Sequence, residues 1–343
     1  MKLSGHQWQK LRELRQFFLS AQPNRASYWD SEQTVELYDQ TLAVRIGWRW
    51  DAVISQLRSL HWQPREKLFL DWGCGSGVAS RKILEAFPNL ECAYLADLSP
   101  HAERYAAKTI RTKFPAISVR SGIPEGEPFC LVLSHVLGEL DDRSEELLAT
   151  IIGRASSLVW VEGGSAALST KLVLWRQRLE WPVIAPCTHR QPCGMLAPEN
   201  HLHWCHFFTR PPGETFMSAE WAEFAKQLEI DHRTVAFSYL VLDRAANNQT
   251  VGLARSIGST RVYKPSAKLQ LCDQNGLHDV ELMKRDFPDV WKALKKGWSP
   301  DLLKVETNGN RIVTFADPTA AGKFSGDSRL PEGSSHSRTP ATP

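Results

Sequence analysis

The chain has 343 residues, of which 42% are hydrophobic and 23% charged, and its formal net charge is +3 at neutral pH. A chain of this length buries a sizeable core without disulfides or metals, and the composition is typical of a globular protein. No run of about 18 apolar residues is present, so we expect no transmembrane helix. The first 21 residues lack the continuous apolar stretch of a secretory signal, so most of the seven cysteines should be reduced.

Residues 1–63 are expected to form an N-terminal helical cap. Near its start, Trp8, Leu11, Leu14 and Phe17 recur at the spacing of one helix face. The rest of this segment carries apolar residues at the same spacing, with few residues that break helices.

Residues 64–245 alternate short apolar runs with helical patterns, which predicts an α/β domain with a doubly wound parallel sheet. Strands are expected over residues 68–71, 92–96, 117–119, 130–134, 158–162 and 235–242. Helices are expected over residues 78–87, 100–114, 145–155, 168–179 and 218–228.

Three further segments depart from this pattern. Residues 182–213 are rich in Pro, Cys, His and Trp and show no period, so we expect an insertion in the domain. Residues 246–316 mix strand-like runs with a basic helical stretch, which predicts a small C-terminal β-containing module that returns to the main sheet. Residues 317–343 are dominated by Pro, Gly, Ser and Thr, and we expect this tail to be disordered.

A glycine-rich turn follows the first expected strand and reads Asp71-Trp-Gly73-Cys-Gly75-Ser-Gly77. Glycines let the backbone turn tightly and approach a ligand, and the helix that follows offers free N–H groups. The third glycine comes one place too early for a dinucleotide site. The spacing instead resembles the first motif of class I S-adenosylmethionine-dependent methyltransferases. Asp97 ends the second strand, where a carboxylate can accept hydrogen bonds from a ribose or, alternatively, cap a helix.

The fourth expected strand leads into residues 134–140, at the edge where class I methyltransferases hold the methyl group. His135 could act as a general base there, and Glu139 is a second candidate, although a lone histidine in this position is more often structural. The Asn or Asp, two prolines and aromatic residue of amino-methylating enzymes are absent. Cys130 begins the strand, which is the wrong end for the nucleophile of a cytosine-C5 enzyme. The methyl acceptor is therefore not indicated.

Three cysteines of the insertion, Cys187, Cys193 and Cys205, fall within 19 residues. Soft thiolates bind zinc or iron–sulfur clusters, and a four-thiolate cluster needs a fourth cysteine. Cys272 is the remaining candidate outside the core strands. The spacing matches no short zinc-knuckle pattern. Zinc held by the three cysteines and a nearby histidine is a second interpretation, and three incidental reduced cysteines are a third.

Together these motifs resemble the methyltransferase-like assembly factors of the mitochondrial small ribosomal subunit, a family with many bacterial members. The matching stretches are residues 70–77, 134–140, 185–193, 204–207, 237–242 and 271–272. The resemblance implies S-adenosylmethionine bound at Asp71, Gly73, Gly75, Gly77 and Asp97, and a [4Fe–4S] cluster held by Cys187, Cys193, Cys205 and Cys272. It also implies action on the maturing small ribosomal subunit, with contact to its rRNA.

Two residues depart from the pattern of this family. Thr188 and Gly194 stand where the family has proline after the first and second cysteines. Neither change removes a ligand, but both allow a differently shaped cluster loop. The weak presequence character of the first residues favours the bacterial cytoplasm, with the mitochondrial matrix as the alternative.

RNA contact also has local support in the C-terminal module. Residues 255–304 contain ten Lys and Arg against six Asp and Glu, a local excess of four positive charges. Such a face can neutralise phosphates, and Lys292, Lys295 and Lys296, which lie near two tryptophans, are the favoured residues. A solvated helix face is the alternative interpretation.

We therefore expect an RNA-directed methyltransferase of the small ribosomal subunit that carries an iron–sulfur cluster. A non-catalytic assembly factor that binds RNA is the first alternative, and a small-molecule methyltransferase with a zinc site is the second. We expect no membrane partner, and the oligomeric state is not indicated.

Overall fold

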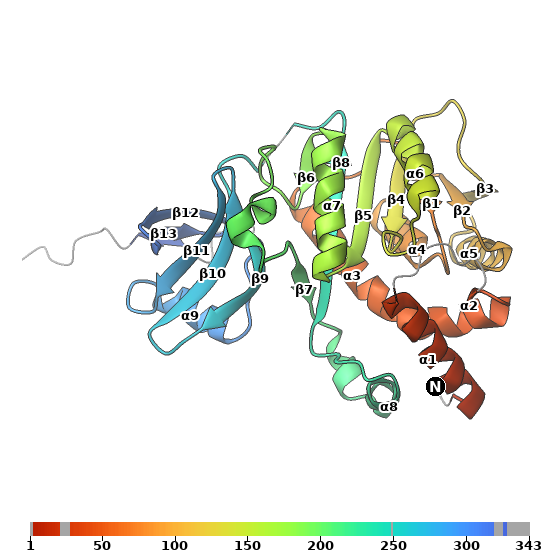
Figure 1. Ribbon diagram of the computed structural model, residues 1–343, viewed down its shortest axis with the longest axis horizontal. Coiled ribbons are helices and arrows are strands. Elements are labelled where there is room, and N and C mark those ends of the chain that lie inside the picture. The colour runs from red at the N-terminus through yellow and green to blue at the C-terminus, as the bar shows by residue number, and fades with distance from the viewer. Residues whose placement is uncertain (1–2, 21–27, 248–249, 319–324, 328–343) are drawn as a thin grey trace, which may run out of the picture. The chain divides into compact units, whose positions relative to one another are not determined.

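The computed structural model of the protein describes residues 3–20, 28–247, 250–318 and 325–327. The chain divides into two compact units, Met1–Val251 and Gly252–Pro343, and their elements are labelled in Figure 1. Within the described ranges, no helix is long and apolar enough to cross a membrane.

The N-terminal unit is built on one mixed sheet. Its strand order is β3-β2-β1-β4-β5-β8-β6, and β7 also pairs with β8. Strands β1 to β5 run parallel to one another, whereas β8 runs antiparallel to β5. The strands are β1 (Leu68–Trp72), β2 (Cys92–Ala96), β3 (Ser118–Ser121), β4 (Cys130–Ser134), β5 (Ser157–Gly163), β6 (Val183–Ala185), β7 (Phe207–Thr209) and β8 (Val235–Asp243). This is the Rossmann-like sheet of class I methyltransferases, so the predicted fold is confirmed.

Helices cover both faces of this sheet (Figure 1). Helices α6 and α7 pack against β4 and β5 on one face, and α3 and α4 lie on the other. The helices are α1 (Gly5–Leu19), α2 (Glu32–Asp39), α3 (Leu42–Ser59), α4 (Val78–Ala86), α5 (Pro100–Lys113), α6 (Asp142–Arg154), α7 (Ala166–Leu179) and α8 (Ala219–Gln227). The central strands are mostly apolar because neither face meets water, and Phe69, Leu131 and Trp160 are completely buried.

The cysteine-rich insertion is joined to the sheet by two short strands that the sequence did not predict. Strand β6 pairs with β8 through Val183 and Ala185, and β7 pairs with β8 over its three residues. The 3₁₀ turns Gly194–Leu196 and Pro198–Asn200 lie between them, and a third, Gly213–Phe216, precedes α8. Strands of three residues are too short to show a period, so the sequence pattern missed them.

The C-terminal unit forms a sheet of its own, so the prediction that this module returns to the main sheet was wrong. Its strand order is β11-β10-β9-β12-β13-β14. Its elements are β9 (Ala254–Val262), β10 (Ser266–Asp273), β11 (Gly276–Met283), α9 (Pro288–Lys295), β12 (Leu302–Asn308), β13 (Arg311–Ala316) and β14 (Ser325–Asp327). Strand β9 bonds to β10 on one edge and to β12 on the other, so neither edge is free for the main sheet.

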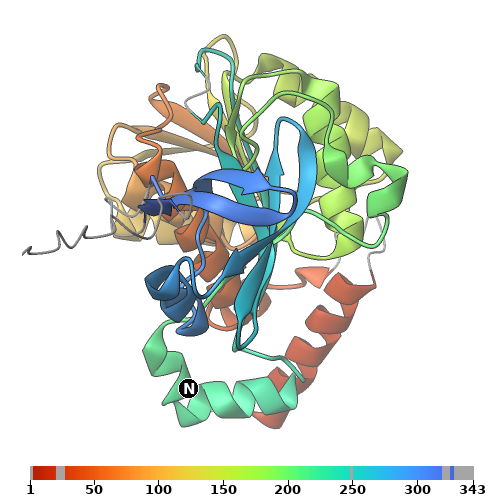
Figure 2. The ribbon, with the colours of Figure 1, turned by 90° about the vertical axis from the view of Figure 1, so that its left-hand side faces the viewer.

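Five of these strands close into a small barrel. Strand β11 also pairs in parallel with β13, which joins the first and fifth strands of the order. A three-strand meander, a helix and a hairpin, closed in this way, have the connectivity of the OB-fold. Figure 2 shows the curved strands in blue. Leu269, Leu271, Leu282, Trp291 and Phe315 form part of the separate core inside the unit.

The expected disordered tail lies mostly outside the described residues. Its described part includes β14, which pairs with β13 over residues 325–327. Residues 319–324 and 328–343 are not described, so the prediction for them is not tested.

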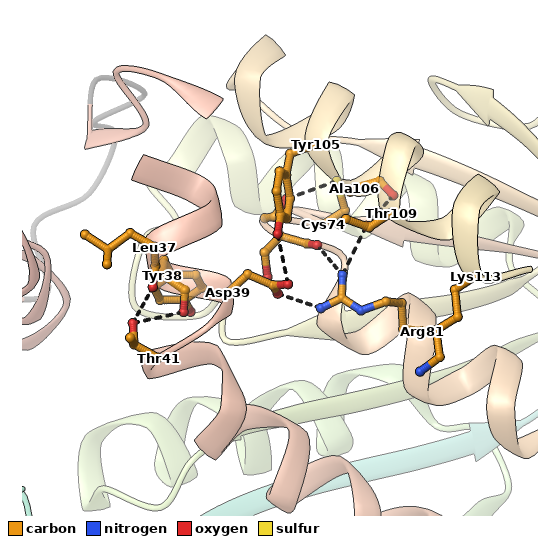
Figure 3. Close-up of polar contacts among 12 residues, drawn as sticks. Leu37, Tyr38, Asp39, Thr41, Cys74, Arg81, Tyr105, Ala106, Thr109 and Lys113 are labelled. Carbon is orange, nitrogen blue, oxygen red and sulfur yellow. Dashed lines mark hydrogen bonds and ion pairs between the residues drawn. The ribbon is translucent and has the colours of Figure 1, made fainter. Parts of the chain in front are cut away.

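A half-buried ion pair joins the N-terminal helices to the helix that follows the glycine-rich turn (Figure 3). Arg81 on α4 donates from Nη2 to Oδ1 of Asp39, the last residue of α2, over 2.5 Å. The same guanidinium donates to the carbonyl of Ser76 at 2.7 Å and to the hydroxyl of Thr109 at 3.2 Å. The Tyr105 hydroxyl donates to the other oxygen of Asp39. Arg81 therefore ties α2, the turn and α5 together.

Replacing this arginine should destabilise the protein. Arg81→Ala leaves the Asp39 carboxylate without its ion-pair partner in a site sheltered from water, so we expect the free energy of unfolding to fall by about 2–3 kcal/mol. Urea unfolding followed by circular dichroism measures the change. Arg104→Ala is the matched control, because it removes an exposed pair with Glu32 and should cost less than about 1 kcal/mol. Equal losses in both variants would contradict this role.

Candidate functional site

The three glycines of the turn after β1 have different surroundings. All three have positive φ, and a side chain on Gly73 would meet Cγ1 of Val136 at 2.6 Å. A side chain on Gly77 would meet Cβ of Ala106 at 2.9 Å. A side chain on Gly75 would meet nothing within 4 Å. Two glycines therefore allow close packing of the protein itself, and the middle one faces open space where a ligand could approach.

Asp97 lies beside this open glycine, as the sequence predicts. Its Oδ2 accepts a hydrogen bond from the Gly75 N–H at 2.8 Å, and its Oδ1 accepts one from the Ser99 N–H at 2.9 Å. Burial raises the pKa of this carboxyl group, and the two hydrogen bonds act in the opposite direction. The structure therefore brings Asp97 and the glycine-rich turn together at one end of the parallel strands.

Asp71 lies near the end of β1, just before the turn. It is completely buried, and its Oδ2 accepts a hydrogen bond from the Ser80 hydroxyl at 2.6 Å. Burial raises the pKa of Asp71 to about 7. Its carboxyl group thus links the end of β1 to α4, which positions the turn that carries the three glycines.

His135 follows β4 with φ of +60° and contacts Arg49. Its Nε2 lies 2.9 Å from Nη1 of Arg49, and its Nδ1 lies 3.4 Å from the Ser134 hydroxyl. A guanidinium only donates, so Nε2 accepts and the ring proton is on Nδ1. Burial and the arginine charge lower the pKa of His135. This neutral, engaged ring favours the structural interpretation over a general base.

Glu139 lies at the same edge and accepts a hydrogen bond from the Tyr28 hydroxyl at 2.8 Å. Burial, with a smaller contribution from the negative charge of Asp97, raises the pKa of Glu139 to about 7, and the hydrogen bond from Tyr28 acts in the opposite direction. Since carboxylates influence each other strongly only at short range, Glu139 and Asp97 share one region of the site. Glu139 can therefore exchange a proton near neutral pH.

Glu162, at the end of β5, holds the segment that contains these residues. Its Oε1 accepts hydrogen bonds from the backbone N–H groups of Val136 and Leu137 at 3.0 and 3.1 Å, and from the Trp160 indole at 2.8 Å. The side chain is completely buried, which raises its pKa to about 7. An acidic residue that ends a run of apolar strand residues is the sequence signal for such a role.

Sequence reasoning missed three residues that complete this edge: Tyr28, Arg49 and Trp50. The Trp50 indole donates to the Ser134 hydroxyl at 3.0 Å, and the Arg49 guanidinium donates to the Ala236 carbonyl at 3.0 Å. These residues come from the helical cap, far along the chain from β4. No local motif marks such contacts.

The four predicted cysteine ligands are outside any disulfide. Cys193 is buried, which raises the pKa of its thiol, and nearby Cys187 raises that pKa further. Cys205 is partly exposed and precedes β7, whereas Cys272 is on β10 of the C-terminal unit. Among the residues that the structure describes, no group of three or more His, Cys, Asp or Glu side chains is arranged to hold a metal ion.

Side chains of the main domain fix the backbone of the insertion. The Cys205 carbonyl accepts hydrogen bonds from the hydroxyls of Ser169 on α7, at 2.6 Å, and Ser238 on β8, at 2.8 Å. Arg176 of α7 is buried and donates to two backbone carbonyls between Cys187 and Cys193, at 2.7 and 2.8 Å. The cysteine-bearing loops are therefore attached to the sheet and to α7.

Residues 42–303 match the model of a protein family described as "Mitochondrial small ribosomal subunit Rsm22". The chain belongs to this family. The match covers most of the N-terminal unit and continues through the C-terminal unit as far as β12, and it confirms the family that the motifs resemble. No curated protein matches the chain by sequence.

The structure is also similar to solved methyltransferases at low sequence identity. Magnesium protoporphyrin IX methyltransferase from Synechocystis PCC 6803, with bound SAH, is 10% identical; the similarity covers 60% of this chain and 86% of that one, with a TM-score of 0.36. Precorrin-6y C5,15-methyltransferase from Geobacter metallireducens GS-15 is 15% identical, with 55% and 86% covered and a TM-score of 0.32. These similarities concern the fold alone.

The raised pKa of Glu139 should make stability depend on pH. The unfolded carboxyl group has an ordinary pKa near 4.5, and the folded one about 7. The native state therefore holds this proton more tightly, and its stability falls as pH rises between these values. Glu139→Gln removes the titrating group, so only the natural protein loses this stability as pH rises. The free energy of unfolding of the variant, relative to that of the natural protein, should therefore increase by about 2–3 kcal/mol between pH 5 and pH 8.

Chemical unfolding at a series of pH values measures this difference. Glu146→Gln, an exposed residue of α6, is the matched control. If the difference in free energy of unfolding between Glu139→Gln and the natural protein stayed constant across the pH range, like that of the control, burial would not control the pKa of Glu139.

Proposed function

We propose that the chain binds S-adenosylmethionine at the glycine-rich turn and acts on the small ribosomal subunit or its rRNA. The observation that carries the first part is the pairing of Gly75 and Asp97 at 2.8 Å, with open space above the glycine. When bound, S-adenosylmethionine supplies an electrophilic methyl group. The N–H groups at the start of α4 and the Asp97 carboxylate offer the polar contacts that its carboxylate and ribose require.

Glu139 is the better of the two proposed proton acceptors for a methyl transfer. It has a pKa of about 7 and shares the region of Asp97, and a general base works best with a pKa near the operating pH. His135 is engaged by Arg49 through the nitrogen that would accept a proton. Tyr28, which donates to Glu139, would hold the carboxylate in position.

A ribosomal partner is supported by the family description, which names the mitochondrial small ribosomal subunit. The same description is consistent with the mitochondrial matrix, the alternative location to the bacterial cytoplasm. A non-catalytic assembly factor is the second candidate function. It is favoured by the residues after β4, which lack a known acceptor motif, and by the engaged ring of His135.

Removing Asp97 should weaken cofactor binding. Asp97→Ala deletes a carboxylate that can accept charge-assisted hydrogen bonds, so we expect the affinity for S-adenosylmethionine to fall by about ten- to a hundredfold. Isothermal titration calorimetry measures it. Asp141→Ala, which removes the N-cap of α6, is the control and should bind as the natural protein does. Unchanged affinity in Asp97→Ala would refute the proposed site.

The two functional candidates are separated by adding purified small ribosomal subunits and S-adenosylmethionine with a labelled methyl group. Transfer of the label that is lost in Glu139→Gln supports an enzyme. Subunit binding without any transfer supports the assembly factor. Transfer to a small molecule without subunit binding supports the remaining alternative, a small-molecule methyltransferase.

We also propose that Cys187, Cys193, Cys205 and Cys272 hold a [4Fe–4S] cluster, with zinc as the alternative. All four are cysteines outside any disulfide, and thiolate sulfur is a donor that both metals accept. The interaction of Cys187 with Cys193, and the hydrogen bonds that fix the insertion, support a preformed part of such a site. Cys272 is included because the family resemblance implies it as the fourth ligand.

Metal analysis of protein purified without oxygen tests this proposal. We expect about four irons per chain and a broad absorption band near roughly 400 nm, with both lost in Cys205→Ser together with thermal stability. Cys92→Ser, on β2, should keep the iron. About one zinc in a colourless protein would select the alternative. If the natural protein contained neither iron nor zinc, the cysteines would have no metal-binding role.

A further inference from the structure

The C-terminal unit contains a hollow of about 590 Å³ on one side of α9. Four lysines line it, with one acidic residue, a proline and a tryptophan. The lining residues are Lys284, Pro288, Asp289, Trp291, Lys292, Lys295 and Lys296. We propose that this hollow, with the adjoining turn between β9 and β10, binds the phosphates and bases of single-stranded RNA. The inference extends the proposed ribosomal function, on which its biological setting rests.

Trp291 holds two of the ammonium groups at the hollow. Its indole N–H donates to the backbone carbonyls of Tyr263 and Ser266, at 3.0 and 3.2 Å, so the ring is fixed. The Nζ atoms of Lys284 and Lys295 lie 4.4 and 5.3 Å from the ring centroid. Cation–π attraction restrains both side chains before a ligand arrives, which reduces the entropy lost on binding.

The lining of the hollow is rich in positive charge. The ion pairs His278–Asp273, Arg285–Asp286 and Arg311–Asp286 of the C-terminal unit do not use the four lysines. Asp286, the nearest acidic residue in sequence outside the lining, is engaged by Arg311 at 2.5 Å and also contacts Arg285. With Asp289 as the single acid of the lining, the hollow carries a net charge of about +3, which suits a polyanion.

The turn between β9 and β10 adds an exposed aromatic ring. Tyr263 is 48% exposed, and Nζ of Lys268 lies 6.0 Å from its ring centroid. Lys268 is opposite Arg261 in the strand register, and both are exposed. The hydrogen bond from Trp291 to the Tyr263 carbonyl joins this turn to α9. An aromatic ring among cations is what a flexible strand of bases and phosphates requires, since bases stack and phosphates pair.

The connectivity of the barrel is consistent with this location. In OB-folds, the loop between the first and second strands is one of the loops that bind oligonucleotides, and here it carries Tyr263. The outer face of β10 and β11 is less suitable, because Asp279 lies opposite Gln270 and Glu281 lies opposite Lys268. We therefore assign the RNA to the loop and α9 rather than to the strand face.

Fluorescence anisotropy with the full chain and a labelled single-stranded RNA of mixed sequence tests this assignment. The variant combines Lys292→Gln, Lys295→Gln and Lys296→Gln, which keeps most of each side-chain stem. We expect affinity to fall at least tenfold at about 0.1 M salt, and the slope of log affinity against log salt to fall by about two, because each phosphate contact on a single strand contributes about 0.7. Tyr263→Ala should weaken binding at least fivefold without changing the slope.

The matched control changes three exposed lysines of the N-terminal unit to glutamine: Lys67, Lys108 and Lys226. It should leave affinity and slope as in the natural protein. The assignment is wrong if the α9 variant behaves like this control. It is also wrong if duplex RNA, or vesicles containing phosphatidylserine, bind more tightly than the single strand through the same lysines.

The two proposals fail separately in this design. Calorimetry with S-adenosylmethionine should give the same affinity in the α9 variant as in the natural protein, and Asp97→Ala should keep its affinity for RNA. RNA binding without small-subunit binding would count against the ribosomal function alone.

Discussion

The geometry of the candidate site depends on one buried carboxylate oxygen, Oε1 of Glu162. It accepts three hydrogen bonds, two of them from the backbone of Val136 and Leu137, so the turn after β4 is fixed against β5. Val136 in turn occupies the space where a side chain on Gly73 would lie. One desolvated carboxyl group thereby sets the positions of β4, β5 and the glycine-rich turn relative to one another. Its three hydrogen bonds compensate for its burial.

The sequence predicted the parallel sheet because its central strands are buried on both faces and read as unbroken apolar runs. The family resemblance grouped Asp97 with the glycine-rich turn as one cofactor site, and the two are hydrogen-bonded in the structure. The reasoning from strand patterns was wrong for the C-terminal unit. A strand-like pattern in β9 indicates a strand but not its partners, and hydrogen bonds to β10 and β12 decide that it belongs to a separate barrel.

Long-range polar contacts account for the rest of what could not be predicted. Tyr28 reaches Glu139 across 111 positions of the sequence, and Arg49 reaches His135 across 86. These contacts determine which side chain can exchange a proton, because burial and a neighbouring charge change the pKa values of both acceptors. A motif gives the residue type and its place on a strand, whereas its protonation is a property of the folded surroundings.

Strand β8 has a consequence for the order of events during synthesis. Both β6 and β7, which bracket the cysteine-rich insertion, pair with β8, yet the ribosome makes residues 183–209 before residues 235–243. A nascent chain therefore exposes Cys187, Cys193 and Cys205 on a segment that has no strand partner. The insertion reaches its folded form only after residue 243 has emerged, so any metal that requires that form is acquired late, at a time set by the strand order.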